Sequence, residues 1–328
     1  MKKNNLSSTK TVLILLFLFF LSVNIFAQQK VTVERQTILM GSQFQITIVA
    51  EDSLKANHYI DMTIDEIARI EELISEWRPH TQISQVNAYA GIKPIQVDSE
   101  VFDLTKRAIA YSMMSDGAFD ISTAAMDRIW KFDGSMDTLP SAQAIKNSIA
   151  HVDYRNIILD STNSTIFLKN KGMKIGFGSI GKGYAADRGR ELLLKHHVEG
   201  GIVNASGDLS TWGTQPNKKP WLIGIRNPFK RNKVIKVLKL KYEAVATSGS
   251  YEKYAEINDI RYSHIINPKT GYPVTGLTSV TIYGPSAEFA NALSTSIMVL
   301  GAQEGRKLVR KYPSYKYLFI TDNGSVIK

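Results

Sequence analysis

The chain contains no cysteine, and its six histidines include no HExxH or other metal-type spacing. The first absence excludes disulfides, cysteine metal sites and thiol nucleophiles, and it fits any redox compartment. It also excludes a lipoprotein anchored through an N-terminal cysteine. The second absence excludes a metal site of the zinc-protease type. The basic stretches lack interleaved aromatic residues, so we expect no nucleic-acid binding despite a formal net charge of +10.

The apolar run at the N-terminus is shorter than the ~20 residues that a membrane-spanning helix needs. It extends from Val12 to Leu21, follows three lysines and fades through Ser22 and Asn24 toward Ala27. This pattern predicts a signal peptide over residues 1–27, followed by one domain over 28–328, with an uncleaved anchor as the alternative. The mature protein is then periplasmic and touches the membrane only transiently. Its charge of 37 − 30 = +7 favours anionic ligands.

Hairpins with helices between them dominate the predicted elements, which favours an α+β fold with largely antiparallel sheets. Val31–Gln36 and Phe44–Val49 alternate as paired strands around Met40. Further strands are expected at 156–159, 165–168, 201–204, 221–226, 234–241 and 277–283, and a last hairpin around 322–324. Helices are expected at 53–75, at 141–150, from the 176–183 motif to about His196, at 287–300 and 303–311, and after Ser99 as N-cap.

A glycine-rich motif opens the helix that ends near His196. It runs from Gly176 through Gly178, Gly181 and Lys182 to Gly183. Glycines allow a positive φ and a close approach of the backbone to a ligand, and the start of a helix points N–H groups at an anion. The segment therefore predicts a phosphate cradle. The alternative is that the glycines only pack the helix against a strand.

Two nucleotide-binding motifs fit this segment poorly. As a Walker A loop it has Gly183 where a Ser or Thr hydroxyl should bind magnesium. As a Rossmann fingerprint it should follow a first strand and precede an acidic residue that binds the ribose. Glu199 has nearly the right spacing, but the motif lies in the middle of a chain that predicts hairpins.

Three polar residues near the C-terminal end suggest chemistry. His264 precedes an Asn-Pro-Lys-Thr-Gly turn that can fix its imidazole, and a histidine can accept a hydroxyl proton near neutral pH. Asn291 and Thr295 are four residues apart on a predicted helix, hence on one face. Alternatively, His264 ends a strand and the other two side chains satisfy local polar contacts. Asp208 is either a turn residue or a second base.

Several motifs in this order resemble the FAD:protein FMN transferase family, also called the ApbE family. They extend from about residue 40 to about 301: Met40-Gly-Ser42, Ser75-Glu-Trp77, Gly117-Ala-Phe-Asp120, Gly178-Ser-Ile-Gly-Lys-Gly-Tyr-Ala-Ala-Asp187, Asn204-Ala-Ser-Gly-Asp208, Ala246-Thr-Ser-Gly249, His264-Ile-Ile-Asn-Pro-Lys-Thr-Gly-Tyr-Pro273 and Ala290-Asn-Ala-Leu-Ser-Thr295. The resemblance implies a single ApbE-like domain related to the T-fold.

The resemblance also implies roles for individual residues. FAD-contacting positions are Met40, Trp77, Ala118, Phe119, Asp120, Lys182 and His264. Magnesium is held by Asn291, Thr295 and a backbone carbonyl near Ser179. The family has an aspartate where this chain has Asn291, so the affinity of this chain for Mg²⁺ should be lower than is usual in the family. It also has an acidic residue where this chain has Gly176.

The activity implied is Mg²⁺-dependent transfer of FMN from FAD to a Thr or Ser hydroxyl of another exported protein, with AMP released. His264 activates the hydroxyl, and Lys182 reaches the diphosphate. Such phosphoryl chemistry depends mainly on positioning and charge neutralisation. Two alternatives share the site: an FAD-binding or flavin-storage protein with weak transfer, and an FAD pyrophosphatase that gives FMN and AMP.

Overall fold

An eight-stranded sheet forms the centre of the protein in a computed structural model that describes residues 30–251 and 253–328. Its strands are β1 (Val31–Leu39), β2 (Ser42–Ala50), β6 (Gly200–Ala205), β7 (Asp208–Trp212), β10 (Ala244–Gly249), β13 (Leu277–Gly284), β14 (Lys316–Thr321) and β15 (Val326–Ile327), which neighbour one another in that order. Every neighbouring pair is antiparallel. The α+β prediction is confirmed, and the Rossmann interpretation is excluded because that fold needs a parallel βαβ sheet.

The first hairpin turns at Met40 and Gly41. Leu39 pairs with Ser42, so the turn has two residues, and both have positive φ, of 51° and 64°. Two consecutive positive φ angles are typical of the turn whose twist matches a β-hairpin. The predicted strand pair is therefore confirmed, and its turn holds the Met40 side chain at one end of the sheet.

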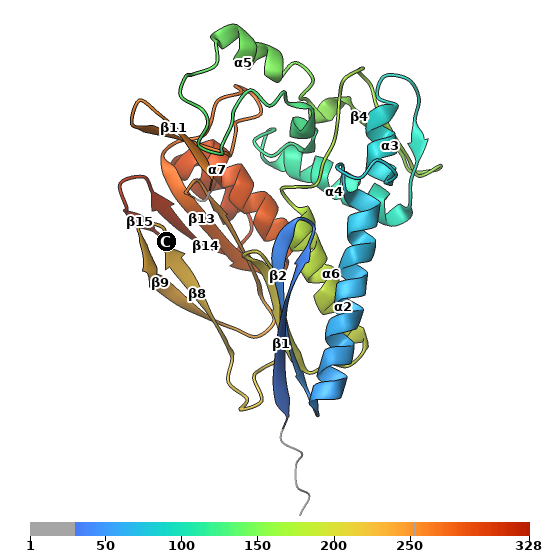
Figure 1. The fold of residues 1–328 in the computed structure, drawn as a ribbon, viewed down its shortest axis with the longest axis vertical. Helices are drawn as coiled ribbons and strands as arrows, with labels where there is room; N and C mark the ends of the chain where they lie inside the picture. Colours follow the sequence, from blue (N-terminus) through green and yellow to red (C-terminus); the bar gives the residue numbers. More distant parts are fainter. Residues whose placement is uncertain (1–29, 252) are drawn as a thin grey trace, which may run out of the picture.

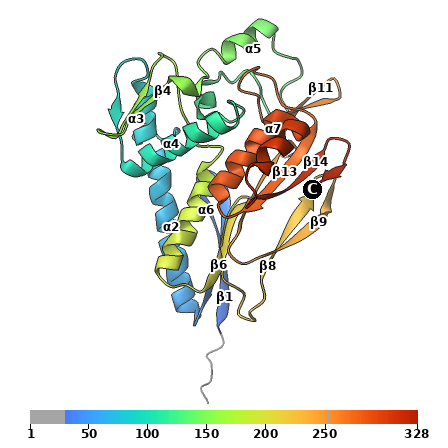
Figure 2. The same ribbon diagram turned by 180° about the vertical axis from the view of Figure 1, so that it is seen from behind.

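Three long helices cover one face of the sheet (Figures 1 and 2): α2 (Ser53–Ile74), α6 (Gly181–Lys195) and α7 (Ala287–Arg310). In α2, Ile60, Ile67 and Ile74 are buried at helical spacing. Helix α7 spans both of the helices that the sequence predicts, at 287–300 and 303–311. Gly301 interrupts the helical backbone between them, with φ 78° and ψ 175°. The glycine thus allows two helical segments to follow each other at an angle.

The helix α4 (Ser99–Met114) corrects one prediction. Ser99 is its first helical residue, and Asp98 is the N-cap. The Asp98 carboxylate makes no cap hydrogen bond, because the side chain of Gln82 binds it instead. A side-chain partner from a preceding helix cannot be read from local capping patterns.

Smaller elements form a second layer beyond the end of α2 (Figure 1). They are α3 (Gln82–Ala88), β3 (Ile95–Gln96), η1 (Ile121–Ala125), α5 (Ala142–Ser148), η2 (Tyr154–Asn156), β4 (Ile157–Asp160), β5 (Thr165–Leu168), β11 (Tyr254–Ile257) and β12 (Ile260–Ser263). The paired strands β4 and β5 and the helix α5 confirm the sequence predictions. Helix α3 and strands β3, β7 and β10 were not predicted.

The opposite face of the sheet is covered by the ribbon of β8 (Trp221–Asn227) and β9 (Lys230–Leu240). Ile225, Leu238 and Leu240 from this ribbon pack with Leu209 and Val245 of the sheet. Lys239 is exposed beside them, as expected for a half-exposed strand. The charged residue Lys239 therefore belongs to an exposed face of this ribbon.

Helices α6 and α7 approach each other at Gly183. A Cβ atom there would lie 2.6 Å from the Ala287 carbonyl oxygen and 2.9 Å from the Glu288 amide nitrogen. Backbone cannot yield as a flexible side chain does, so Gly183→Ala should destabilise the protein by about 1–3 kcal/mol. Urea unfolding tests this. Gly178→Ala is the matched control, because its Cβ would meet nothing within 4 Å; equal stabilities would contradict the close packing.

Within the described ranges, no helix is long and apolar enough to cross a bilayer. The predicted signal peptide over residues 1–27 lies outside those ranges.

Candidate active site

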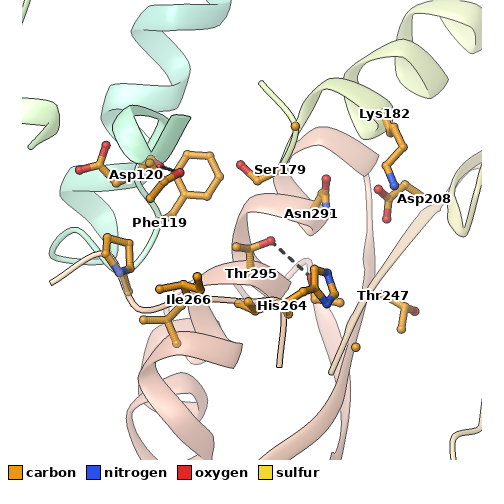
Figure 3. A pocket seen from close by; sticks show the side chains of 18 of the residues that line it. Phe119, Asp120, Ser179, Lys182, Asp208, Thr247, His264, Ile266, Asn291 and Thr295 are labelled. Carbon is orange, nitrogen blue, oxygen red and sulfur yellow. Dashed lines mark hydrogen bonds between the residues drawn. The ribbon is translucent and has the colours of Figure 1, made fainter. Parts of the chain in front are cut away.

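One cavity of about 410 Å³ brings together the segments that the sequence singles out. Its wall includes the 178–182 segment at the start of α6, the β6–β7 turn, β10, the 264–268 loop and α7 (Figure 3). The predicted site residues that line it are Ala118, Phe119, Asp120, Ser179, Lys182, His264, Asn291 and Thr295. Chain segments more than a hundred residues apart therefore share one site.

The start of α6 has free capacity for an anion. Its N-cap is Ile180, whose side chain cannot accept a hydrogen bond, and no acidic residue lies in the first turn. The N-terminal N–H groups of such a helix, together with its dipole, favour a negatively charged ligand. Lys182 lies in the same turn and lines the cavity. The predicted cradle is thus placed at the cavity wall.

The glycines of the cradle fit the alternative interpretation, in which they allow close packing of the helix. None of Gly176, Gly178, Gly181 and Gly183 has a positive φ. Gly181 packs near Ile74 and Met40, whose Cδ1 and Cε atoms lie 3.3 and 3.4 Å from where its Cβ would be. Close packing between segments explains the small residues at Gly176, Gly181 and Gly183, whereas a Cβ at Gly178 would meet nothing within 4 Å.

Oxygen atoms converge beside the cradle at Asn291. The acceptors around its side chain assign the amide nitrogen inward, where it donates to the Ser179 carbonyl oxygen at 2.5 Å and to Asp208 Oδ2 at 3.3 Å. On the next turn of α7, the Thr295 hydroxyl lies 3.4 Å from Ser248 Oγ. The amide NH₂ therefore occupies a position surrounded by acceptors, as a cation would.

These residues fit a small hard cation. Mg²⁺ prefers oxygen ligands, and an Asn side chain supplies one when the amide turns over. The available donors are the Ser179 carbonyl, the Asp208 carboxylate, the Asn291 amide and the Thr295 hydroxyl. Among the described residues no group of three or more His, Cys, Asp or Glu side chains could hold a metal ion. Of the four donors named above, only Asp208 brings a full negative charge.

The imidazole ring of His264 is held by a hydrogen bond to the backbone. Its Nδ1 lies 3.0 Å from the carbonyl oxygen of Lys253, and a carbonyl can only accept. The neutral ring therefore carries its proton on Nδ1 and its basic lone pair on Nε2. Phe132 packs edge-on against the ring, with centroids 6.4 Å apart. The histidine is thus oriented and lines the cavity, as a proton acceptor must be.

A second cavity of about 470 Å³ adjoins the first through Gly178 and Lys182. It is lined by Met40 and by Trp77, whose side chain is 68% exposed. The guanidinium of Arg128 lies over the indole, 4.4 Å from the ring centroid. A large exposed aromatic ring backed by a cation is available for stacking against a planar ligand.

Asp120 has a structural task as well as a place in the cavity wall. Its Oδ1 accepts from the amide and hydroxyl of Ser122, and its Oδ2 accepts from the Tyr154 amide. Burial raises the pKa of Asp120, although these hydrogen bonds oppose the effect. Both carboxylate oxygens are used in holding η1 and η2, so any ligand contact here adds to these bonds. Phe119 is likewise buried, against Tyr111.

Sequence reasoning gave too little weight to Asp208 and missed Arg128. Asp208 reaches Asn291 only because β7 lies next to β10 and faces α7. Arg128 reaches Trp77 across about fifty residues of chain. The Asn-Ala-Ser-Gly-Asp motif, which ends in Asp208, was the available signal for that residue. No local pattern indicated Arg128. Glu199, the Rossmann candidate, pairs instead with Lys30.

Together, the fold and the cavity define an α+β protein whose candidate site lies between the N-terminus of a helix and a cluster of oxygen atoms. Residues 40–319 match the model of the ApbE family, and the chain belongs to that family.

The chain is similar to known relatives over most of their length. A FAD:protein FMN transferase of Klebsiella pneumoniae is 31% identical over 292 residues, covering 88% of this chain and 89% of the relative. One of Treponema pallidum is 31% identical over 265 residues, covering 76% and 73%. The crystal structure of the ApbE protein from Thermotoga maritima has a TM-score of 0.83 at 31% identity, covering 91% and 97%. The Pseudomonas stutzeri flavinyl transferase ApbE gives 0.79 at 27%, covering 93% and 95%. This protein is accordingly a transferase of the flavin-transfer type.

Proposed function

We propose that this protein transfers FMN from FAD to a Ser or Thr hydroxyl of an exported acceptor protein, with Mg²⁺ as cofactor and AMP as the second product. The observation that carries the proposal is the single cavity shared by the uncapped start of α6, the oxygen cluster at Asn291 and the oriented His264. A diphosphate needs its charge neutralised from more than one side, and this cavity offers that.

FMN transfer exchanges one bond at phosphorus for another and needs one group to take a proton. The acceptor oxygen forms a bond to the FMN phosphorus, while the bond from that phosphorus to the bridging oxygen breaks and AMP leaves with the bridging oxygen. Nε2 of His264 takes the hydroxyl proton. The start of α6 and Lys182 stabilise charge on the phosphate oxygens. The FMN then remains attached through a phosphoester.

Mg²⁺, when bound, supplies further neutralisation of the diphosphate. Ser179, Asp208, Asn291 and Thr295 would hold it. The flavin would lie against Trp77, near Met40, in the adjoining cavity. Ala118, Phe119 and Asp120 would close the other side. Export through the N-terminal segment would place the enzyme and its acceptor together in the periplasm.

Product analysis separates this proposal from its alternatives. Purified protein is incubated with FAD and Mg²⁺, with and without a hydroxyl-bearing acceptor domain, and the small molecules are separated by chromatography. We expect AMP and a fluorescent acceptor band, both dependent on the acceptor. Unchanged FAD would support a flavin-binding protein, and free FMN with AMP would support a pyrophosphatase, because water then replaces the hydroxyl.

Asn291→Asp should raise the affinity of the site for Mg²⁺. An aspartate adds a charge to the oxygen set, so half-maximal transfer should need about tenfold less Mg²⁺. Without metal, the new carboxylate faces Asp208 and the Ser179 carbonyl with no N–H to donate, which should lower the melting temperature. Activity titrations and thermal melts with and without Mg²⁺ test both effects. An unchanged Mg²⁺ requirement would remove Asn291 from the metal site.

A further inference from the structure

Glu76 occupies the space that a side chain at position 176 would need. A Cβ atom built on Gly176 would lie 2.7 Å from Glu76 Oε1 and 2.9 Å from its carboxyl carbon. Glu76 comes directly after Ser75, the C-cap of α2, so its backbone is held by the end of a long helix. The carboxyl group therefore lies against the backbone of the cradle, and only a glycine at 176 leaves room for it.

The Glu76 carboxylate lies where two cavities meet. It lines the cavity of Met40, Trp77 and Lys182, and also a neighbouring cavity of about 580 Å³ that contains Arg128. Half-burial raises the pKa of Glu76, and the charge of Arg128 opposes that rise. A partly desolvated carboxylate at a cavity wall favours a hydrogen-bond donor as its neighbour and disfavours a phosphate.

Neighbouring carboxylates on α2 have other tasks. Glu71 accepts from the Met40 amide at 2.9 Å and pairs with Arg78 at 3.1 Å, and Glu72 pairs with His80 at 2.7 Å. Glu76 instead projects toward the cradle and faces the same space as the indole of Trp77.

We propose that Glu76 binds the flavin half of FAD by accepting a hydrogen bond from an uncharged donor, either the ring imide N–H or a ribityl hydroxyl. This inference rests on the proposed function. It assigns to Glu76 the carboxylate that the family resemblance expects at position 176, delivered from α2 across a glycine. The carboxylate also disfavours a pose with the diphosphate against it, because like charges repel.

Ligand binding without acceptor tests the assignment. Affinities for FAD and FMN are measured by quenching of flavin fluorescence, and the affinity for ADP, which lacks the flavin half, by calorimetry. Glu76→Ala should weaken FAD and FMN about tenfold or more, as expected for a hydrogen bond to a charged group, and should leave ADP unchanged. Glu76→Gln keeps an acceptor oxygen and should lose less. Flavins methylated at the imide nitrogen distinguish the two donors: if the imide donates, they bind wild type and Glu76→Ala equally.

Two further variants separate binding from folding. Glu66→Gln is the matched control, since Glu66 lies on α2, the helix that precedes Glu76, and its side chain is 15% exposed and pairs with Arg69; its flavin affinity should match wild type. Glu76→Ala combined with Gly176→Asp supplies a carboxylate from the other side. Shortening Glu76 removes the two nearest atoms to the new Cβ, which leaves the Ala124 Cβ at 3.1 Å as the next, so flavin affinity should recover.

The outcomes are distinct. Equal FAD affinity in wild type and Glu76→Ala would overturn the inference and leave the transferase proposal intact. An equal loss for FAD, FMN and ADP would also overturn it, because Glu76 would then act on the whole site. If wild-type protein bound no FAD, the proposed function would fail, and this inference would fail with it.

Discussion

Replacing His264 by alanine should slow FMN transfer about 10²- to 10⁴-fold, the range that a general base contributes. The reason is geometric: the Lys253 carbonyl fixes the proton on Nδ1, so Nε2 is the nitrogen that can take the hydroxyl proton. FAD affinity should fall much less than the rate, because the cradle and the aromatic platform of Trp77 remain. Single-turnover rates with saturating FAD separate the two effects.

His58→Ala provides the control for this variant, because His58 lies on α2 beside Tyr59 and does not line the cavity. Its transfer rate should match that of wild type. A His264→Ala protein that transfers FMN at the wild-type rate would remove His264 from the proton-transfer step. A variant that instead loses FAD binding in proportion to its rate would make His264 a binding residue only.

Replacing Asp187 by alanine should cost about 3–5 kcal/mol of unfolding free energy, as expected for breaking a buried charged network. Its carboxylate accepts from Ser210 Oγ at 2.5 Å, from Ser286 Oγ at 2.7 Å and from the Glu288 amide at 3.0 Å, and it pairs with Arg190. These bonds join α6 to β7 and to the start of α7. They fix Ser179 and Asn291 relative to each other, so FAD and metal binding should weaken along with stability.

Chemical denaturation measures this loss, and Asp137→Ala is the control. Asp137 is exposed, so its removal should change stability by no more than about 0.5 kcal/mol. If Asp187→Ala unfolded at the same denaturant concentration as Asp137→Ala, the buried network would not be what couples the two helices.

Features set by local sequence were predictable. The two-residue turn at Met40 and Gly41 follows from the strand pattern on either side, and the common face of Asn291 and Thr295 follows from helical spacing. The order of the short motifs also gave the family, because several motifs in one order are far more specific than a single one.

Features set by contacts between distant segments were not predictable. The sequence could not show that Asp208 would stand beside Asn291, because this depends on the place of β7 in the sheet. It showed Gly176 as a lost carboxylate, whereas the structure places the carboxylate of Glu76 against it. The sequence left open whether the cradle glycines serve a ligand or the packing of the helix, and the contacts at Gly183 show that α6 packs closely there. In each case the deciding contact joins residues far apart in the chain.

The most direct test of flavin transfer is the intact mass of an acceptor domain after incubation with this protein, FAD and Mg²⁺. We expect the acceptor to gain the mass of one FMN less one water, with one AMP released per acceptor. Replacing the modified Ser or Thr by alanine should abolish the gain. An acceptor that a known flavin transferase modifies, but that keeps its original mass here, would contradict the account.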